Sequence, residues 1–288
     1  MESRRVSDTF GLFFTPDQWS AARRFSQFIG RPFNDREVEK GTKSALSHLN
    51  KFDTLAALAN RLVPSLSEDQ VELERDGHTP AARGREFAAL METLVCELYA
   101  SLDGVRRTVF GAYRTVQGVQ NSSTEKLFKR AAGREYGETF PEEVRAVLAS
   151  AYSEWFPSLK ELRTELTHGD VGNCHLDANS GGVRYIHGGL GAGSRAMVVE
   201  DIVDRVNGFA AGVLRIAEAV FAHLYSNLES DDRQIMCGIY KGRIYERLVK
   251  PEARLTFNSG RCFSKSWFDL APGFECPLRS RCGAYHAD

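Results

Sequence analysis

One long stretch of helical periodicity, from about residue 81 to 117, constrains the fold of this chain more than any other feature. Gly104 and Gly111 each lower the helix propensity of this stretch by about 1 kcal/mol relative to alanine, which predicts a kink or tight packing there. The apolar side chains recur at intervals of three and four residues, the spacing of one face of an α-helix: Phe87, Leu90, Leu94, Leu98, Leu102 and Val105. The sequence therefore predicts a mainly α-helical protein.

Shorter helices are predicted on both sides of this stretch. Thr15 and Pro16 have the residue types that begin a helix, and Gly30 follows its expected end. Residues 65–80 are polar, end in a turn pattern and have little to bury, so we expect a domain boundary there. The other predicted helices cover residues 34–49, 52–62, 125–132, 141–155, 157–168 and 194–227.

Two parts of the chain show β patterns instead. Residues 173–176 and 183–187 flank a turn sequence and predict a small β-hairpin inserted among the helices. From residue 235 onward, short strands and turns predict a β-rich tail. We therefore expect an N-terminal helical segment (residues 1–80), a helical bundle (81–228) and a small cysteine-containing β-rich tail (229–288).

Composition limits the range of functions. With 42% hydrophobic and 26% charged residues, the chain resembles an ordinary soluble globular protein. Its formal net charge of −1 argues against a broadly basic nucleic-acid binder, so any contact with RNA must be local. The N-terminal residues do not have the pattern of a signal peptide, and no run approaches the roughly 18 apolar residues that span a bilayer. We expect a cytoplasmic protein without a membrane partner.

Residues 155–170, WFPSLKELRTELTHGD, contain the most informative pair of polar residues. Pro157 begins the predicted helix, and Arg163 and His168 fall on its last turns. Arginine carries a permanent, forked positive charge that matches a phosphate, and histidine exchanges a proton near neutral pH. On an ideal helix, five residues of separation leave the two side chains about 140° apart. A groove between helices or a second copy of the protein would let both reach one ligand.

Arg163, the polar Thr164 and then His168 resemble the signature of the HEPN superfamily, an arginine followed a few residues later by a histidine. The resemblance covers roughly residues 83–228 and implies a HEPN-like helical bundle that pairs as a homodimer. Many HEPN proteins are metal-independent ribonucleases of toxin or antiviral defence systems. Others have lost catalysis and only bind. The resemblance thus implies RNA as a partner, an antitoxin or another regulatory protein as a second one, and no metal or cofactor.

The chemistry expected of this pair is cleavage of RNA by its own 2′-hydroxyl group. This reaction requires a positioned phosphate and groups that remove and donate protons. Arg163 would neutralise the phosphate oxygens, and His168 would act as general acid or base. Thr164 and Asp103, the latter on the long helix, are predicted to support the pair.

Alternatives remain open at this point. Arg163 can instead pair with Glu161 or Asp170, His168 can cap its own helix, and Asp103 can be solvated. The protein would then be a non-catalytic HEPN-like RNA- or protein-binding scaffold, or a helical regulatory protein in which the motif is a coincidence.

Four of the six cysteines lie in the last fifth of the chain: Cys237, Cys262, Cys276 and Cys282. In a cytosolic protein such a cluster favours a metal site or plain burial over disulfides. No close C-x2-C pair of the kind typical of tetrahedral zinc sites is present. We therefore favour buried, small apolar side chains and keep zinc as the alternative.

Overall fold

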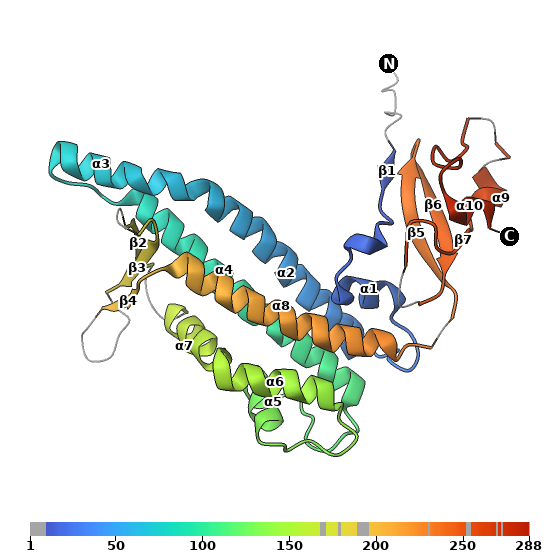
Figure 1. Cartoon of the computed structure of the whole chain (residues 1–288), viewed down its shortest axis with the longest axis horizontal. Helices are drawn as coiled ribbons and strands as arrows, with labels where there is room; N and C mark the ends of the chain where they lie inside the picture. Colours follow the sequence, from blue (N-terminus) through green and yellow to red (C-terminus); the bar gives the residue numbers. More distant parts are fainter. Residues whose placement is uncertain are drawn as a thin grey trace. The chain divides into compact units, whose positions relative to one another are not determined.

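The computed structural model describes residues 10–167, 171–177, 180–188, 196–229, 231–251, 255–268, 270–271 and 273–287. The protein is mainly α-helical with small antiparallel sheets, which confirms the predicted class (Figure 1). The chain divides into two compact units, residues 35–220 and residues 1–34 together with 221–288. This division differs from the three consecutive segments expected from the sequence, because the N-terminal residues join the C-terminal part.

In the unit of residues 35–220, helices α2 (Arg36–Leu62) and α4 (Ala82–Tyr113) pack along each other (Figure 1). Glycines permit their close approach. A Cβ atom on Gly104 would lie 2.4 Å from the backbone nitrogen of Ala45, and one on Gly41 would lie 2.5 Å from that of Thr108. The glycines of the long helix thus serve tight packing.

Two predictions for the region before α4 are wrong. One continuous helix, α2, replaces the two helices expected over residues 34–62, and Asp35 begins it by accepting a hydrogen bond from the Glu37 amide (2.7 Å). The polar residues 65–80, expected to form a domain boundary, instead contain helix α3 (Leu66–Asp76), which follows the short turn η2 (Val63–Ser65). The Asp69 carboxylate of α3 accepts the Gly84 amide at the start of α4 (2.7 Å), so one polar residue of this segment caps another helix.

Three shorter helices follow in the same unit: α5 (Thr124–Ala132), α6 (Glu142–Glu154) and α7 (Phe156–Leu166). The rings of Phe128 and Phe156 stack with centroids 4.0 Å apart, and both side chains are fully buried. This aromatic pair fixes α7 against α5.

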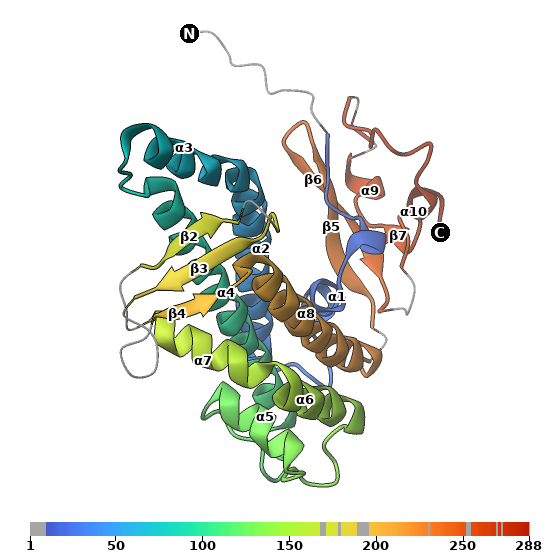
Figure 2. The ribbon, with the colours of Figure 1, turned by 60° about the vertical axis from the view of Figure 1, so that its left-hand side comes forward.

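The predicted hairpin is confirmed as strands β2 (Asn173–Leu176) and β3 (Val183–His187). A third strand, β4 (Met197–Val199), pairs with β3 and completes a sheet in the order β2-β3-β4 (Figure 2). The sequence predicted helix for these three residues. The last long helix, α8 (Ile202–Ser226), begins later because the Asp201 carboxylate caps the Val203 and Asp204 amides, each at 3.0 Å.

Helix α8 is long and apolar enough, by length and composition, to cross a membrane, but half of that window is buried inside the protein. Gly212 of α8 faces the ring of Trp155, where a Cβ atom would lie 2.4 Å from the indole. The sequence also predicts one apolar face for this helix, from Val199 onward. Val199 lies in β4 instead, whereas the other members of that face lie in α8 and are buried: Ile202, Val206, Val213, Ile216, Val220 and Leu224.

The other unit is built on a sheet in the order β1-β5-β6-β7. Strands β5 (Arg233–Tyr240) and β6 (Arg243–Val249) form an antiparallel hairpin around Lys241 and Gly242, which both have positive φ angles. These strands confirm the predicted β-rich tail. The remaining elements of this sheet and its borders are β1 (Gly11–Leu12), β7 (Arg261–Cys262), α9 (Lys265–Phe268) and α10 (Gly283–His286).

The first predicted helix is shorter than expected. Pro16–Gln18 form only the short turn η1, and helix α1 (Ala21–Phe28) begins after Ser20, whose hydroxyl accepts the Arg23 amide. The chain between β1 and α1 places Phe14 in a core with Phe28, Ile235, Tyr245 and Val249. The N-terminal residues are therefore part of the core of the β-rich tail.

Candidate functional site

Arg163 lies on the last turn of α7, and its guanidinium group is stacked on α4. The three leucines of α7, at residues 159, 162 and 166, are buried, and Arg163 lies beside them at half-buried exposure. The guanidinium carbon lies 5.2 Å from the centroid of the Tyr99 ring. This distance is that of a cation–π contact, which uses the charge of the guanidinium and does not consume its N–H donors, the groups that bind carboxylates and phosphates.

The carboxylates considered as alternative partners give Arg163 no described ion pair. Glu161 and Arg163 are both described, and no ion pair joins them. Asp170 lies outside the described residues. The cation of Arg163 therefore rests on an aromatic ring in the described part of the chain.

His168, the predicted partner of Arg163, also lies outside the described residues. Helix α7 ends at Leu166 and Thr167 is a turn residue, so the described helix is shorter than the one predicted over residues 157–168. The described residues on either side are anchored. The Thr167 amide donates to the Arg163 carbonyl (3.2 Å), and the Gly172 amide donates to the Glu92 carboxylate (2.9 Å).

Four residues of α4 form a polar stripe that faces this region: Glu92, Cys96, Tyr99 and Asp103. Their spacing of four, three and four residues places them on one face of the helix. Glu92 holds the segment after the motif, because it accepts both the Gly172 amide and the Tyr185 hydroxyl (2.7 Å). Tyr99 holds Arg163. The α4 stripe therefore contacts the chain on both sides of residues 168–170.

Asp103, the supporting residue predicted from the sequence, is bound to other groups. Its carboxylate accepts a hydrogen bond from the Thr124 hydroxyl at the start of α5 and lies 3.8 Å from Nε of Arg106. Burial raises the pKa of Tyr99, the charge of Asp103 raises it further, and the charge of Arg163 lowers it. Asp103 is thus an electrostatic neighbour of the ring that carries Arg163.

Thr164 is exposed, and its hydroxyl donates to the Lys160 carbonyl within α7 (2.8 Å). The side chain borders a surface pocket between α5, α6 and α7. An ion pair between Lys160 and Glu125 (2.8 Å) crosses this pocket. Thr164 therefore lies beside Arg163 but has a local partner in its own helix.

Sequence reasoning missed Tyr99 and Glu92, the two α4 residues that hold the motif segment. Their polar side chains recur in step with Asp103 along a helix whose opposite face is apolar, and this spacing was visible in the sequence. The partner residues were not, because the contacts join segments up to 93 positions apart.

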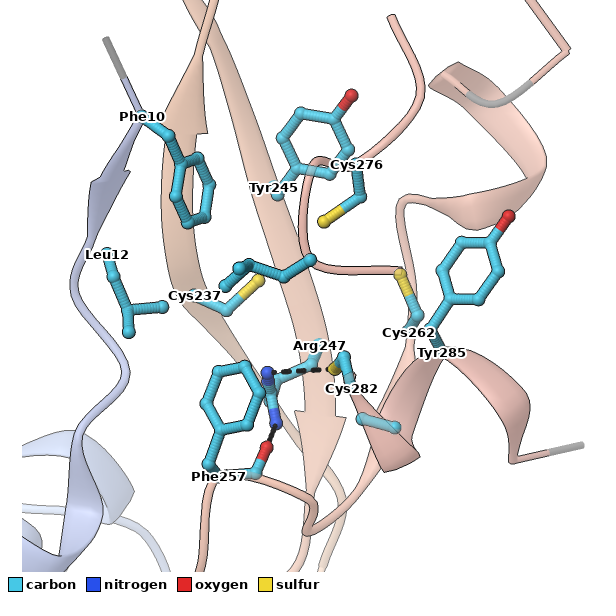
Figure 3. Close-up of a pocket in the computed structure, with 12 residues that line it drawn as sticks. Phe10, Leu12, Cys237, Tyr245, Arg247, Phe257, Cys262, Cys276, Cys282 and Tyr285 are labelled. Atoms are coloured by element: carbon cyan, nitrogen blue, oxygen red, sulfur yellow. Dashed lines mark hydrogen bonds between the residues drawn. The ribbon is translucent and has the colours of Figure 1, made fainter. Parts of the chain in front are cut away.

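A cluster of thiols lies in the unit of residues 1–34 and 221–288, called the β-rich unit below. Its four cysteines line one small pocket (Figure 3): Cys237, Cys262, Cys276 and Cys282. Burial raises the pKa of Cys237 to about 11, and the nearby charge of Arg247 acts in the opposite direction. Within the described residues, no group of three or more His, Cys, Asp or Glu is arranged to hold a single metal ion. Only Cys237 and Cys282 are buried, so plain burial describes two of the four thiols.

In comparisons with known proteins, no protein family, curated protein or solved structure matches this chain.

Proposed function

We propose that the protein is a metal-independent endoribonuclease of the HEPN type, of the kind used in toxin–antitoxin and antiviral defence systems. The proposal is supported by one observation above all, the position of Arg163. Its guanidinium lies over the ring of Tyr99, and within the described residues no ion pair joins it to a carboxylate, so in this proposal its N–H groups bind a phosphate. The resemblance of the motif adds His168 as the second catalytic residue.

In this proposal Arg163 binds the non-bridging oxygens of the scissile phosphate and stabilises the charge that develops on them. The 2′-hydroxyl of the same nucleotide attacks phosphorus, and the bond from phosphorus to the 5′ oxygen breaks. One base removes the 2′ proton and one acid returns a proton to the leaving oxygen. His168 performs one of these transfers, and a second copy of the chain brings the other histidine, as the resemblance to dimeric HEPN proteins implies.

The proposed site is local, in agreement with the net charge of −1. Two cations, Arg163 and Arg106, lie near Tyr99, where their charges lower the pKa of its hydroxyl while those of Asp103 and Glu125 raise it. The proposed location is cytoplasmic, with RNA as substrate and an antitoxin or regulatory protein as a further partner.

A non-catalytic HEPN-like binding protein is the second candidate, and the charge of the neighbouring pocket favours it. The pocket beside Thr164 is lined by Glu125, Glu161 and Glu165 against one cation, Lys160. Such a balance suits a basic protein segment better than a phosphate backbone. Binding without cleavage would select this second function.

The test is cleavage of labelled single-stranded RNA by the purified protein in the presence of EDTA. We expect cleavage by the wild type and losses of about 100- to 1,000-fold in Arg163→Gln and His168→Ala. Arg75→Gln is the matched control, because Arg75 is an exposed arginine of α3 whose partner is the adjacent Asp76. Cleavage that survives both substitutions would reject this site, and absence of cleavage with retained RNA binding would reject the ribonuclease.

A further inference from the structure

We propose that Cys237, Cys262, Cys276 and Cys282 bind an iron–sulfur cluster of the four-iron type in the β-rich unit. The four thiols come from separate parts of the chain: strand β5, strand β7, the segment after α9 and the residue before α10. Figure 3 shows their sulfur atoms turned toward the same space. This inference is independent of the ribonuclease proposal.

Burial of small apolar side chains would not require every cysteine of this unit to line the same pocket. Residues 1–34 and 221–288 contain four cysteines in all, each of them described, and every one lines this pocket. The remaining two, Cys96 and Cys174, belong to the other unit. Two of the four thiols are partly exposed. Burial alone therefore does not explain why cysteine stands at these two positions.

The arrangement suits a cluster better than a single ion. A zinc ion draws four sulfurs to about 2.3 Å from one point, and no group in the described residues is arranged for a single ion. A four-iron cluster instead takes one thiolate at each of its four iron atoms, so its ligands stand farther apart. All four thiols line one small pocket, so they are close enough to share one bound group.

Arg247 supplies a second, independent observation, because it is a cation that needs a negative partner. Only 2% of its surface is exposed. Its guanidinium carbon lies 4.2 Å from the ring centroid of Phe14 and 5.3 Å from that of Phe257. Its guanidinium donates to the carbonyl oxygens of Phe257 and Ser259 and to Sγ of Cys282 (3.5 Å). Its Nε atom is also buried, and among the described residues it has no hydrogen-bond partner.

No carboxylate within the described part of the chain pairs with Arg247, although burial of an unpaired charge is costly. Four thiolates around an iron–sulfur core provide the missing negative charge beside the guanidinium. Each thiol loses its proton when it binds iron. Hydrogen bonds from Arg247 to the ligand sulfurs would then adjust the reduction potential of the cluster.

The test is the metal content of the full-length protein purified without oxygen, followed by reconstitution with ferrous iron and sulfide if it emerges empty. We expect about four iron and four acid-labile sulfide per chain, with visible thiolate-to-iron absorption. Cys276→Ser, at a partly exposed thiol, should lower the iron content severalfold, whereas Cys96→Ser and Cys174→Ser should leave it unchanged. Circular dichroism checks that each variant is folded.

Two results would overturn the proposal. One is wild-type protein that contains no iron and gains none on reconstitution, or that contains one zinc ion instead. The other is a folded Cys276→Ser variant with the full iron content of the wild type. Because the wild-type measurement does not depend on any variant, misfolding of a substituted chain leaves the test intact.

Discussion

Two arginines on aromatic rings, one in each unit of the protein, differ in what surrounds them. Arg163 lies over Tyr99 at the half-buried rim of α7. Arg247 lies between Phe14 and Phe257 and is almost completely buried. The ring contact is similar in kind, but water reaches only the first arginine freely.

Access to water decides what each cation is suited to do. A guanidinium at the surface is solvated when no ligand is present and can exchange water for an incoming phosphate. A buried guanidinium has lost its hydration, so it depends on permanent partners. Arg163 therefore suits a transient anionic substrate, and Arg247 suits a resident anionic group.

The largest effect expected from this difference is on stability. Arg247→Met removes a buried side chain, the donor to two partly buried carbonyl groups and the contact with two rings, so we expect a loss of about 3–5 kcal/mol in the free energy of unfolding. Arg163→Met should cost less than about 1 kcal/mol, since water replaces its contacts. Urea unfolding of the two variants measures both values. Equal losses would show that burial does not distinguish the two arginines.

The sequence predicted the elements of both regions better than their assembly. The apolar rhythm of α4, the leucines of α7 and the Lys241–Gly242 turn follow from local rules, because each depends on neighbours in the chain. The pairing of β1 with β5 does not, since it joins residues more than two hundred positions apart. Helix α3 was missed for a related reason, because its Asp69 stabilises the start of another helix.

The candidate sites show the same limit. Arg163 was found because its residue type and its place before His168 resemble a known motif. Tyr99, which carries its side chain, could be identified only once α4 and α7 were placed together. For the four tail cysteines, the sequence spacing lacked a close pair and favoured plain burial, whereas folding brings all four to one pocket beside Arg247.

A smaller effect concerns the buried thiol of Cys174, which lies in the unit without the cysteine cluster. Cys174 in β2 is buried beside Glu92, and burial first and then the charge of Glu92 raise its pKa from 9.0 to about 12. The unfolded chain therefore loses this proton at lower pH than the folded protein does. The stabilisation by Cys174 is complete below about pH 9 and falls by at most about 1.4 kcal/mol per pH unit as the pH rises toward 12.

Urea unfolding of the wild type and Cys174→Ala, measured from about pH 8 to about pH 10.5, tests this expectation. The stability difference between the two proteins should shrink as the pH rises. A constant difference would mean that the Cys174 thiolate is tolerated in the folded protein, as the cluster proposal requires of the four thiols in the other unit but not of this one.

The smallest effect concerns the ring beneath Arg163. Tyr99→Leu removes the aromatic face but keeps an apolar side chain, so RNA binding should weaken only about two- to fivefold, the equivalent of about 0.5–1 kcal/mol. Tyr99→Phe is the matched control, since it keeps the ring and its stacking on Phe156 and loses only the hydroxyl. That hydroxyl is neutral at pH 7, since burial raises its pKa further above the ordinary value near 10, so its loss should leave binding unchanged. Equal weakening in both variants would instead mean that the hydroxyl, whose pKa the charge of Asp103 raises, takes part in holding the substrate. The ring contact would then not be what Arg163 and Arg247 have in common.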